Sequence, residues 1–107
     1  MLYLDLGRCG GFTTGRDIAA MSCEQGGVLV VPHCFSTDVL LAATLQFVTT
    51  LAHEWLIEFP VTASKRLGTI LTKAVTPVAG VLHVPDGAGL GIELDDDEVE
   101  RRMVRPR

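Results

Sequence analysis

The sequence lacks any apolar run long enough to cross a membrane. Its longest strongly apolar stretch, residues 39–52, is interrupted by four polar side chains and falls short of the roughly 20 residues that a membrane-spanning helix needs. The N-terminus also lacks the charged start followed by an apolar segment that marks a secretory signal. We therefore expect no membrane segment and a cytoplasmic location.

Positive charge is also scarce. There are 9 Lys and Arg residues against 13 Asp and Glu residues, for a net charge of -4 at pH 7, and no basic cluster is interleaved with aromatic residues. Proteins that bind nucleic acid usually present a basic surface to the phosphate groups, and anionic membranes attract a basic surface in the same way. The charge balance therefore argues against both kinds of partner.

Cysteine is present without the spacing of a metal or redox motif. Cys9, Cys23 and Cys34 are odd in number, and no two of them enclose two residues, as zinc knuckles and redox motifs do. We expect three reduced thiols. Cys34 adjoins His33, but successive side chains of an extended strand point to opposite faces, so we expect that pair to bind no metal.

The sequence does contain three short apolar runs that predict buried strands, at residues 2–6, 28–31 and 55–59. The second run is apolar throughout, as expected of a strand covered on both faces in a parallel sheet. Pro32 suits the end of that strand because it has no N–H to donate. The length of 107 residues and a hydrophobic content of 48% fit a single globular domain.

A helix is predicted after the first strand. The glycines at 10 and 11 allow a tight turn, and the hydroxyl of Thr13 or Thr14 is expected to cap the helix start. The helix should continue to Glu24, because the glycines at 26 and 27 stop it.

A second helix is predicted after the second strand, capped by Ser36 or Thr37. Its apolar stripe is expected to face the core. A turn at His53 and Glu54 then leads to the third strand. The residues of the expected stripe are Val39, Leu40, Ala43, Phe47, Val48 and Leu51.

The strands and helices alternate, which predicts a parallel α/β sheet with right-handed connections. The strand ends at Asp5, His33 and Glu58 are 28 and 25 residues apart. This repeat is close to the roughly 31 residues of one unit in an eightfold barrel.

The pattern weakens after Pro60. A short helix is predicted for residues 64–72, extended chain with a turn at Ala79 and Gly80 for residues 75–84, and a glycine-rich loop for residues 85–91. That loop lacks the context of a dinucleotide or phosphate site. Acidic residues precede basic ones between 95 and 102, which suits the dipole of a terminal helix.

The candidate site consists of Asp5, His33 and Glu58, because ligands of parallel sheets bind beyond the carboxyl ends of the strands. Neighbouring strands are about 4.8 Å apart, so we expect Asp5 to reach His33 and orient it as a general base. Glu58 is expected to be kept neutral by an apolar setting and to donate a hydrogen bond to a developing oxyanion. Any one of the three alone would more often be a structural polar group.

Four segments in order resemble the C-terminal part of the barrel domain in the enolase superfamily, in its mandelate racemase and acid-sugar dehydratase subgroup. Residues 5–13 resemble the exit of the sixth strand, residues 31–37 the end of the seventh, and residues 56–60 the eighth. Residues 84–94 are similar to the tail that returns to the capping domain.

The resemblance implies a partial TIM (β/α)8 barrel, in which residues 1–60 supply strands six to eight and residues 61–107 a helix and an extended tail. It implies removal of the proton α to a carboxylate, with His33 as the base, Asp5 as its partner and Glu58 at the carboxylate end of the substrate. The family uses Mg²⁺, whose ligands lie on strands three to five. Those strands have no counterpart here, so we expect no metal ligands in this chain.

Two hypotheses about function follow. In the first, the chain is the catalytic C-terminal portion of a racemase or dehydratase, acts on a hydroxy acid or acid sugar, and is inactive until another chain supplies the missing half. In the second, it is a non-catalytic remnant or a small α/β binding module that self-associates across an open sheet edge.

Overall fold

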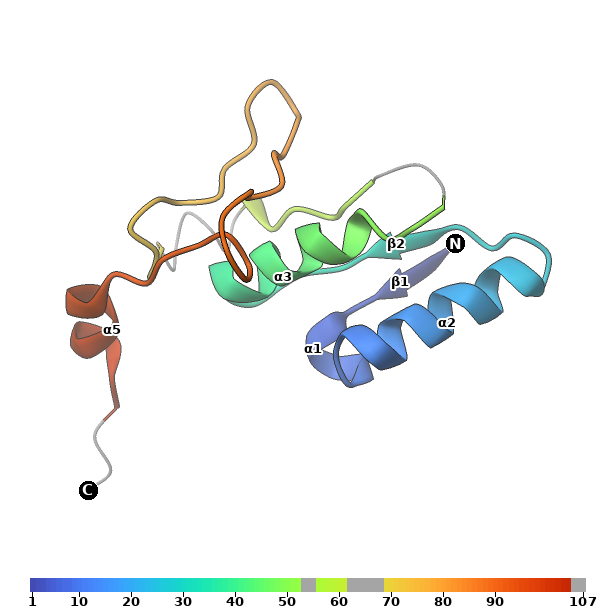
Figure 1. Cartoon of the computed structure of the whole chain (residues 1–107), viewed down its shortest axis with the longest axis horizontal. Coiled ribbons are helices and arrows are strands. Elements are labelled where there is room, and N and C mark those ends of the chain that lie inside the picture. The colour runs from blue at the N-terminus through green and yellow to red at the C-terminus, as the bar shows by residue number, and fades with distance from the viewer. Residues whose placement is uncertain (53–55, 62–68, 105–107) are drawn as a thin grey trace.

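A computed structural model describes residues 1–52, 56–61 and 69–104. Figure 1 shows two adjacent strands flanked by helices, from which the C-terminal half leads away as loops to a last helix. The elements in the described residues are β1 (Leu2–Leu4), α1 (Leu6–Cys9), α2 (Phe12–Glu24), β2 (Val30–Pro32), α3 (Asp38–Val48) and α5 (Asp96–Arg102).

The strands β1 and β2 are parallel, as predicted, and pair Leu2 with Val30 and Leu4 with Pro32. β2 is buried along its whole length, which confirms that it is covered on both faces. β1 is shorter than predicted and more exposed, because Leu2 and Tyr3 keep 37% and 59% of their surface open to solvent. The expectation of a fully buried first strand was therefore wrong.

The helix α2 begins at Phe12, one residue before Thr13, which is the earlier of the two residues predicted to cap it. Gly11 occupies the N-cap position without a side-chain hydrogen bond, and Gly15 N donates to Gly11 O at 3.0 Å. Thr13 and Thr14 therefore lie inside the helix. Gly15 packs closely against α1, since a Cβ there would lie 2.7 Å from Leu6 Cδ2 and would require that side chain to shift.

Two glycines end α2 where the sequence predicts it. Gly26 and Gly27 have φ values of 102° and 72°, a region that favours glycine. β2 starts at Val30, two residues later than predicted, and Val28 is 42% exposed. The strand also extends one residue further, to Pro32.

Among the described residues, the third predicted strand is reduced to a single β-bridge. Trp55 and the turn predicted at residues 53–54 lie outside the described residues. Glu58 pairs in parallel with His33, and Glu58 N donates to Pro32 O at 3.1 Å. A longer ladder needs Pro32 to donate an N–H toward this segment, and proline has none.

The helix α3 is capped by Thr37, one of the two predicted residues, whose Oγ1 accepts a hydrogen bond from Leu40 N at 3.3 Å. The predicted stripe is only part of its buried surface. One core cluster joins Phe47 to β1 and β2, and a second joins Leu41 and Leu45 to Cys34. A helix packed on two sides buries residues around most of its circumference.

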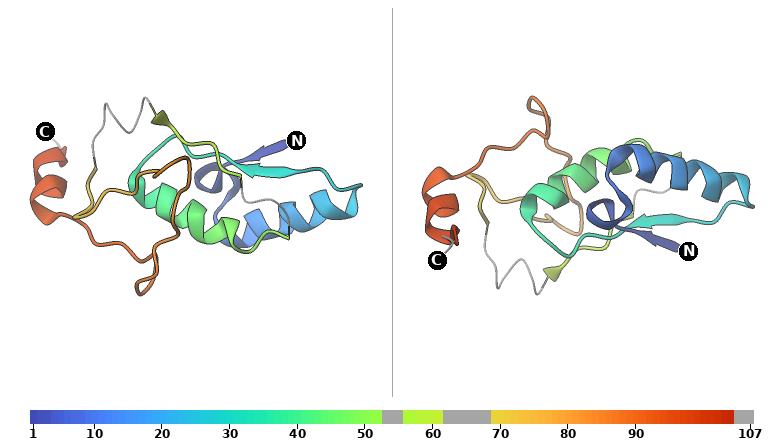
Figure 2. Two further views of the ribbon diagram at one scale, coloured as in Figure 1. Left: turned by 90° about the horizontal axis from the view of Figure 1, so that it is seen from above. Right: turned by 90° about the horizontal axis from the view of Figure 1, so that it is seen from below.

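The C-terminal half runs as extended chain and turns. Val78 and Val81 form an antiparallel bridge around the predicted turn, where Ala79 and Gly80 have φ values of 50° and 80°. Gln46 Nε2 on α3 donates to Pro85 O at 2.8 Å and ties the glycine-rich loop to the body of the protein. Figure 2 shows α5 set apart from α1, α2 and α3 in both views.

The helix predicted at residues 64–72 lies mostly outside the described residues. Its last part, from Thr69 to Thr72, is not helical, because Leu71 forms an antiparallel bridge with Leu94. The helix α5 confirms the terminal helix that the charge pattern predicts. Asp95 caps it, and Glu98 forms ion pairs with Arg101 and Arg102.

The described residues thus form a small parallel α/β unit. The Cα radius of gyration is 14.9 Å, above the about 13 Å of a compact domain of 100 residues, because the tail extends away from the sheet. A partial eightfold barrel remains a prediction. Among the described residues, no helix has the length and apolar content needed to cross a membrane.

Candidate functional site

The ends of the strands bring two of the three predicted residues into contact. His33 directly follows β2, and its backbone N donates to Leu4 O at 2.8 Å. Because Glu58 is the bridge partner of His33, both side chains leave the backbone at the same rim. His33 Nδ1 lies 2.6 Å from Glu58 Oε2.

This contact lies in a solvent-accessible position. The side chains of His33 and Glu58 are 30% and 51% exposed. A carboxyl group that is half exposed lacks the desolvation that the sequence-based hypothesis needed to keep Glu58 neutral. The apolar setting predicted for Glu58 is therefore not found on its exposed side, and its role as a hydrogen-bond donor stays a prediction.

Asp5 lies at the same end of the sheet but does not contact His33 in the described structure. Its Oδ1 accepts a hydrogen bond from Gly7 N at 2.8 Å, and its Oδ2 lies 3.5 Å from Arg8 Nε. Asp5 is the N-cap of α1, which begins directly after it. The predicted Asp5 to His33 hydrogen bond was wrong because β1 ends at Leu4 and the cap turns the carboxylate toward the helix.

Cys34 points away from this rim, as expected for the residue after His33. It is 1% exposed and packs against Leu41 and Leu45. Burial raises the pKa of the Cys34 thiol, and the negative charge of Asp5 adds to the effect. Cys34 is therefore a core residue.

The described residues do not fit a magnesium site. Mg²⁺ binds oxygen ligands in octahedral geometry, whereas no group of three His, Cys, Asp or Glu side chains in the described ranges is arranged to hold a metal ion. The carboxylates of Asp5 and Glu58 already have partners within the chain.

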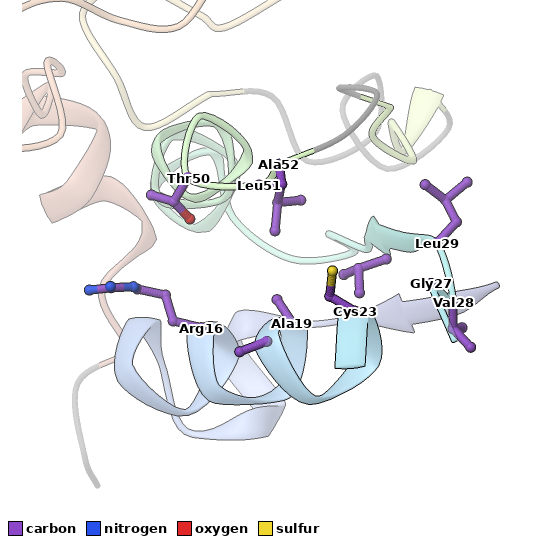
Figure 3. Close-up of a pocket in the computed structure, with 11 residues that line it drawn as sticks. Arg16, Ala19, Cys23, Gly27, Val28, Leu29, Thr50, Leu51 and Ala52 are labelled. Carbon is purple, nitrogen blue, oxygen red and sulfur yellow. The ribbon is translucent and has the colours of Figure 1, made fainter. Parts of the chain in front are cut away.

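A cavity of about 330 Å³ lies at the opposite end of the strands, between α2, the start of β2 and the residues after α3 (Figure 3). Cys23 on α2 points into it. No sequence motif marks this cavity. The available signal is the set of small side chains at Ala19, Cys23 and Gly27, which leave room beside β2.

Comparison with known proteins places the chain in a family. Residues 1–99 match the family described as enolase C-terminal domain-like. The chain is 36% identical over 115 aligned positions to D-galactarolactone cycloisomerase of Agrobacterium fabrum (strain C58). The alignment covers 99% of the chain and 30% of that relative, so the chain spans less than a third of the length of the curated protein. The resemblance found in four sequence segments is thus confirmed, and the chain belongs to the enolase C-terminal domain-like family of the enolase superfamily.

Proposed function

We propose that this chain supplies the acid/base side of an enolase superfamily enzyme, with His33 as the group that removes the proton α to a substrate carboxylate. The observation that supports this most directly is the position of His33. The imidazole follows a buried parallel strand at its carboxyl end, is 30% exposed, and has a carboxylate 2.6 Å from one ring nitrogen. These are the requirements of a general base at a sheet rim.

The proposed chemistry begins with proton transfer to His33. The electron pair of the broken C–H bond moves into the carboxylate and gives an enediolate. A racemase completes the reaction by returning a proton to the same carbon, and a dehydratase completes it by releasing a hydroxyl group that His33 protonates to water. Glu58 is the carboxylate beside the base, and Asp5 lies at the same end of the sheet as the cap of α1.

The proposed substrate class is an acid-sugar carboxylate or its lactone. The name of the relative gives D-galactarolactone as its substrate and cycloisomerisation as its reaction. The chain of 107 residues aligns with 30% of that relative. We therefore propose that it acts only together with the segments that make up the rest of such an enzyme. Since the described residues do not form a metal site, we expect the chain alone to show no exchange of the α proton of such substrates.

A chimera tests the function. The segment of the Agrobacterium fabrum enzyme that aligns with this chain is replaced by residues 1–107, and conversion of D-galactarolactone is measured. We expect the chimera to be active and His33→Asn to lower kcat by about 10² to 10⁴, the usual contribution of a general acid or base.

His83→Asn is the matched control, because His83 is exposed and lies in the extended chain after α3. It should leave turnover unchanged. Equal turnover in the His33→Asn and parent chimeras would contradict the proposal. So would a parent chimera that is folded by circular dichroism but converts no substrate.

A further inference from the structure

We propose that the cavity at the amino end of β2 (Figure 3) binds a free aliphatic carboxylate of medium chain length. The hydrocarbon chain of this ligand lies beside Ala19, Cys23 and Leu51, and its carboxylate group pairs with Arg16. The cavity is at the end of β2 opposite His33. The inference therefore goes beyond the proposed function and does not depend on it.

One face of α2 forms a wall of the cavity. Its lining residues are Arg16, Ala19, Ala20 and Cys23, and spacings of three and four residues place them on the same side of the helix. Three of the four side chains are small, which leaves room between α2 and the residues after α3. Figure 3 shows Arg16 at one end of this face and Cys23 toward the other.

Hydrogen bonds hold the walls of the cavity in place. Ser22 Oγ donates to Val28 O at 2.9 Å, and Val28 N donates to Ser22 O at 3.2 Å, which fixes the end of α2 against the start of β2. On the other side, Leu51 N donates to Val48 O at 3.1 Å, and Leu51 packs against the core cluster that contains Val30. The cavity therefore lies between elements that the fold itself positions.

Polar groups of the lining already have partners within the chain. Leu29 O accepts a hydrogen bond from Leu2 N at 2.8 Å, and Thr50 Oγ1 donates to Phe47 O at 2.8 Å. Both backbone polar groups of Val28 are also bonded. A sugar acid would lose the hydration of its hydroxyl groups here without gaining hydrogen bonds in return. A hydrocarbon chain gains free energy by leaving water for apolar side chains.

Arg16 gives the cavity a positive charge. Within the described part of the chain it forms no ion pair, and the residue is exposed, so its guanidinium group is in contact with water. A guanidinium group can bind a carboxylate through two parallel hydrogen bonds. An apolar cavity with such a cation at one end is complementary to an amphipathic anion, whose chain is buried while its charged group stays near water.

The volume of the cavity indicates the length of the ligand. A cavity of about 330 Å³ has room for about eleven water molecules, since each occupies about 30 Å³ in the liquid. A methylene group is of similar size, so a carboxylate with a chain of about eight carbons fills the space. Octanoate is therefore the probe.

Isothermal titration calorimetry of the purified chain with octanoate, below the concentration at which it forms micelles, tests the site. We expect 1-octanol, which lacks the charge, to bind about threefold more weakly than octanoate. Arg16→Gln should raise the Kd for octanoate about two- to fivefold, as expected for an ion pair in contact with water. Lys73→Gln, which removes another exposed cation, is the matched control and should leave the Kd unchanged. Ala19→Leu should weaken binding of both ligands, because the added side chain occupies the cavity.

Cys23 reports where octanoate binds, because its side chain points into the cavity. Octanoate at ten times its Kd occupies about nine-tenths of the sites, so iodoacetamide should modify Cys23 about tenfold more slowly. Cys9 is not part of the lining and should react at an unchanged rate in the same sample, which makes it an internal control.

A failure of octanoate to bind, or binding that leaves the Cys23 rate unchanged, would overturn the proposal. Equal affinities of the wild-type and Arg16→Gln chains for octanoate would overturn the pairing with Arg16, as would equal affinities for octanoate and 1-octanol. If labelling of Cys23 slows with rising protein concentration alone, a second copy covers the cavity and the proposal is wrong. The labelling experiment uses the wild-type chain, so it decides even if a variant fails to fold.

Discussion

At the scale of single residues, burial distinguishes the three thiols. Cys34 is buried, Cys9 is partly buried and Cys23 is exposed. Burial raises the pKa of Cys34, and the surrounding core also blocks access of reagents. Cys34 should therefore behave as an apolar core residue, while Cys23 behaves as an accessible thiol beside the cavity of Figure 3.

We expect iodoacetamide to modify Cys23 first and Cys34 last, as measured by mass spectrometry after timed exposure. The folded state favours the protonated thiol of Cys34. Raising the pH through the range in which exposed thiols ionise therefore ionises the unfolded chain first and lowers the free energy of unfolding. Labelling of Cys34 should increase steeply in this pH range, because a less stable core opens more often.

Cys34→Ala is the control for this pH effect, because it should flatten the alkaline decline in stability, whereas Cys23→Ala should not. Modification of Cys34 at the rate of Cys23 in the folded chain at neutral pH would contradict the described burial.

The positions of the candidate site could be predicted from the sequence, but the contacts between them could not. Periodicity places Asp5, His33 and Glu58 at strand ends, because short apolar runs mark strands. Which carboxylate reaches His33 depends on where β1 stops, and that is decided by Asp5 acting as a helix cap. In a sequence, an aspartate that caps a helix cannot be distinguished from an aspartate that ends a strand.

At the scale of elements, capping governs where α3 begins. Thr37 Oγ1 accepts a hydrogen bond from Leu40 N, and α3 contributes to both core clusters. Loss of the cap therefore affects the packing of the sheet as well as the helix.

We expect Thr37→Ala to lower the free energy of unfolding by about 1 kcal/mol, the usual loss when an N-cap hydroxyl is removed. Thr37→Ser keeps the hydroxyl and should remain near the wild-type value. Chemical denaturation followed by circular dichroism measures both. If Thr37→Ala is as stable as Thr37→Ser, the hydroxyl makes no contribution.

The end of α2 and the starts of α3 and α5 were predicted better than the buried faces of the helices. Glycines at 26 and 27, Thr37 and the acidic start of α5 each act locally, so the sequence contains the signal. The burial of α3 depends on what lies on its second side, namely Ile57, Phe59 and the tail. Contacts between segments that are distant in the sequence do not produce a periodic pattern of apolar residues along the helix.

At the scale of the whole molecule, β1 presents a strand edge. In the described residues β1 pairs with β2 alone. Leu2 N and Leu4 O bond toward β2, so the alternation of a strand directs the N–H and C=O of Tyr3 to the other edge. Tyr3 and Met1 are 59% and 69% exposed there. An open edge with apolar neighbours favours pairing with another strand.

We expect the purified chain to self-associate with rising concentration in sedimentation velocity experiments, and Tyr3→Lys to shift it toward monomer, because a charge on an edge strand opposes pairing. Val104→Lys, at an 89% exposed position in the tail, is the control and should change little. A chain that stays monomeric throughout would exclude association through this edge.

The turn between α2 and β2 offers a place to attach a reporter. Gly26 and Gly27 have open space around them, since a Cβ on either would meet nothing within 4 Å. The turn lies at the amino end of β2, whereas His33 follows its carboxyl end. A short peptide tag or fluorophore inserted between these glycines would therefore signal binding or assembly of the chain without entering the rim where His33 and Glu58 meet.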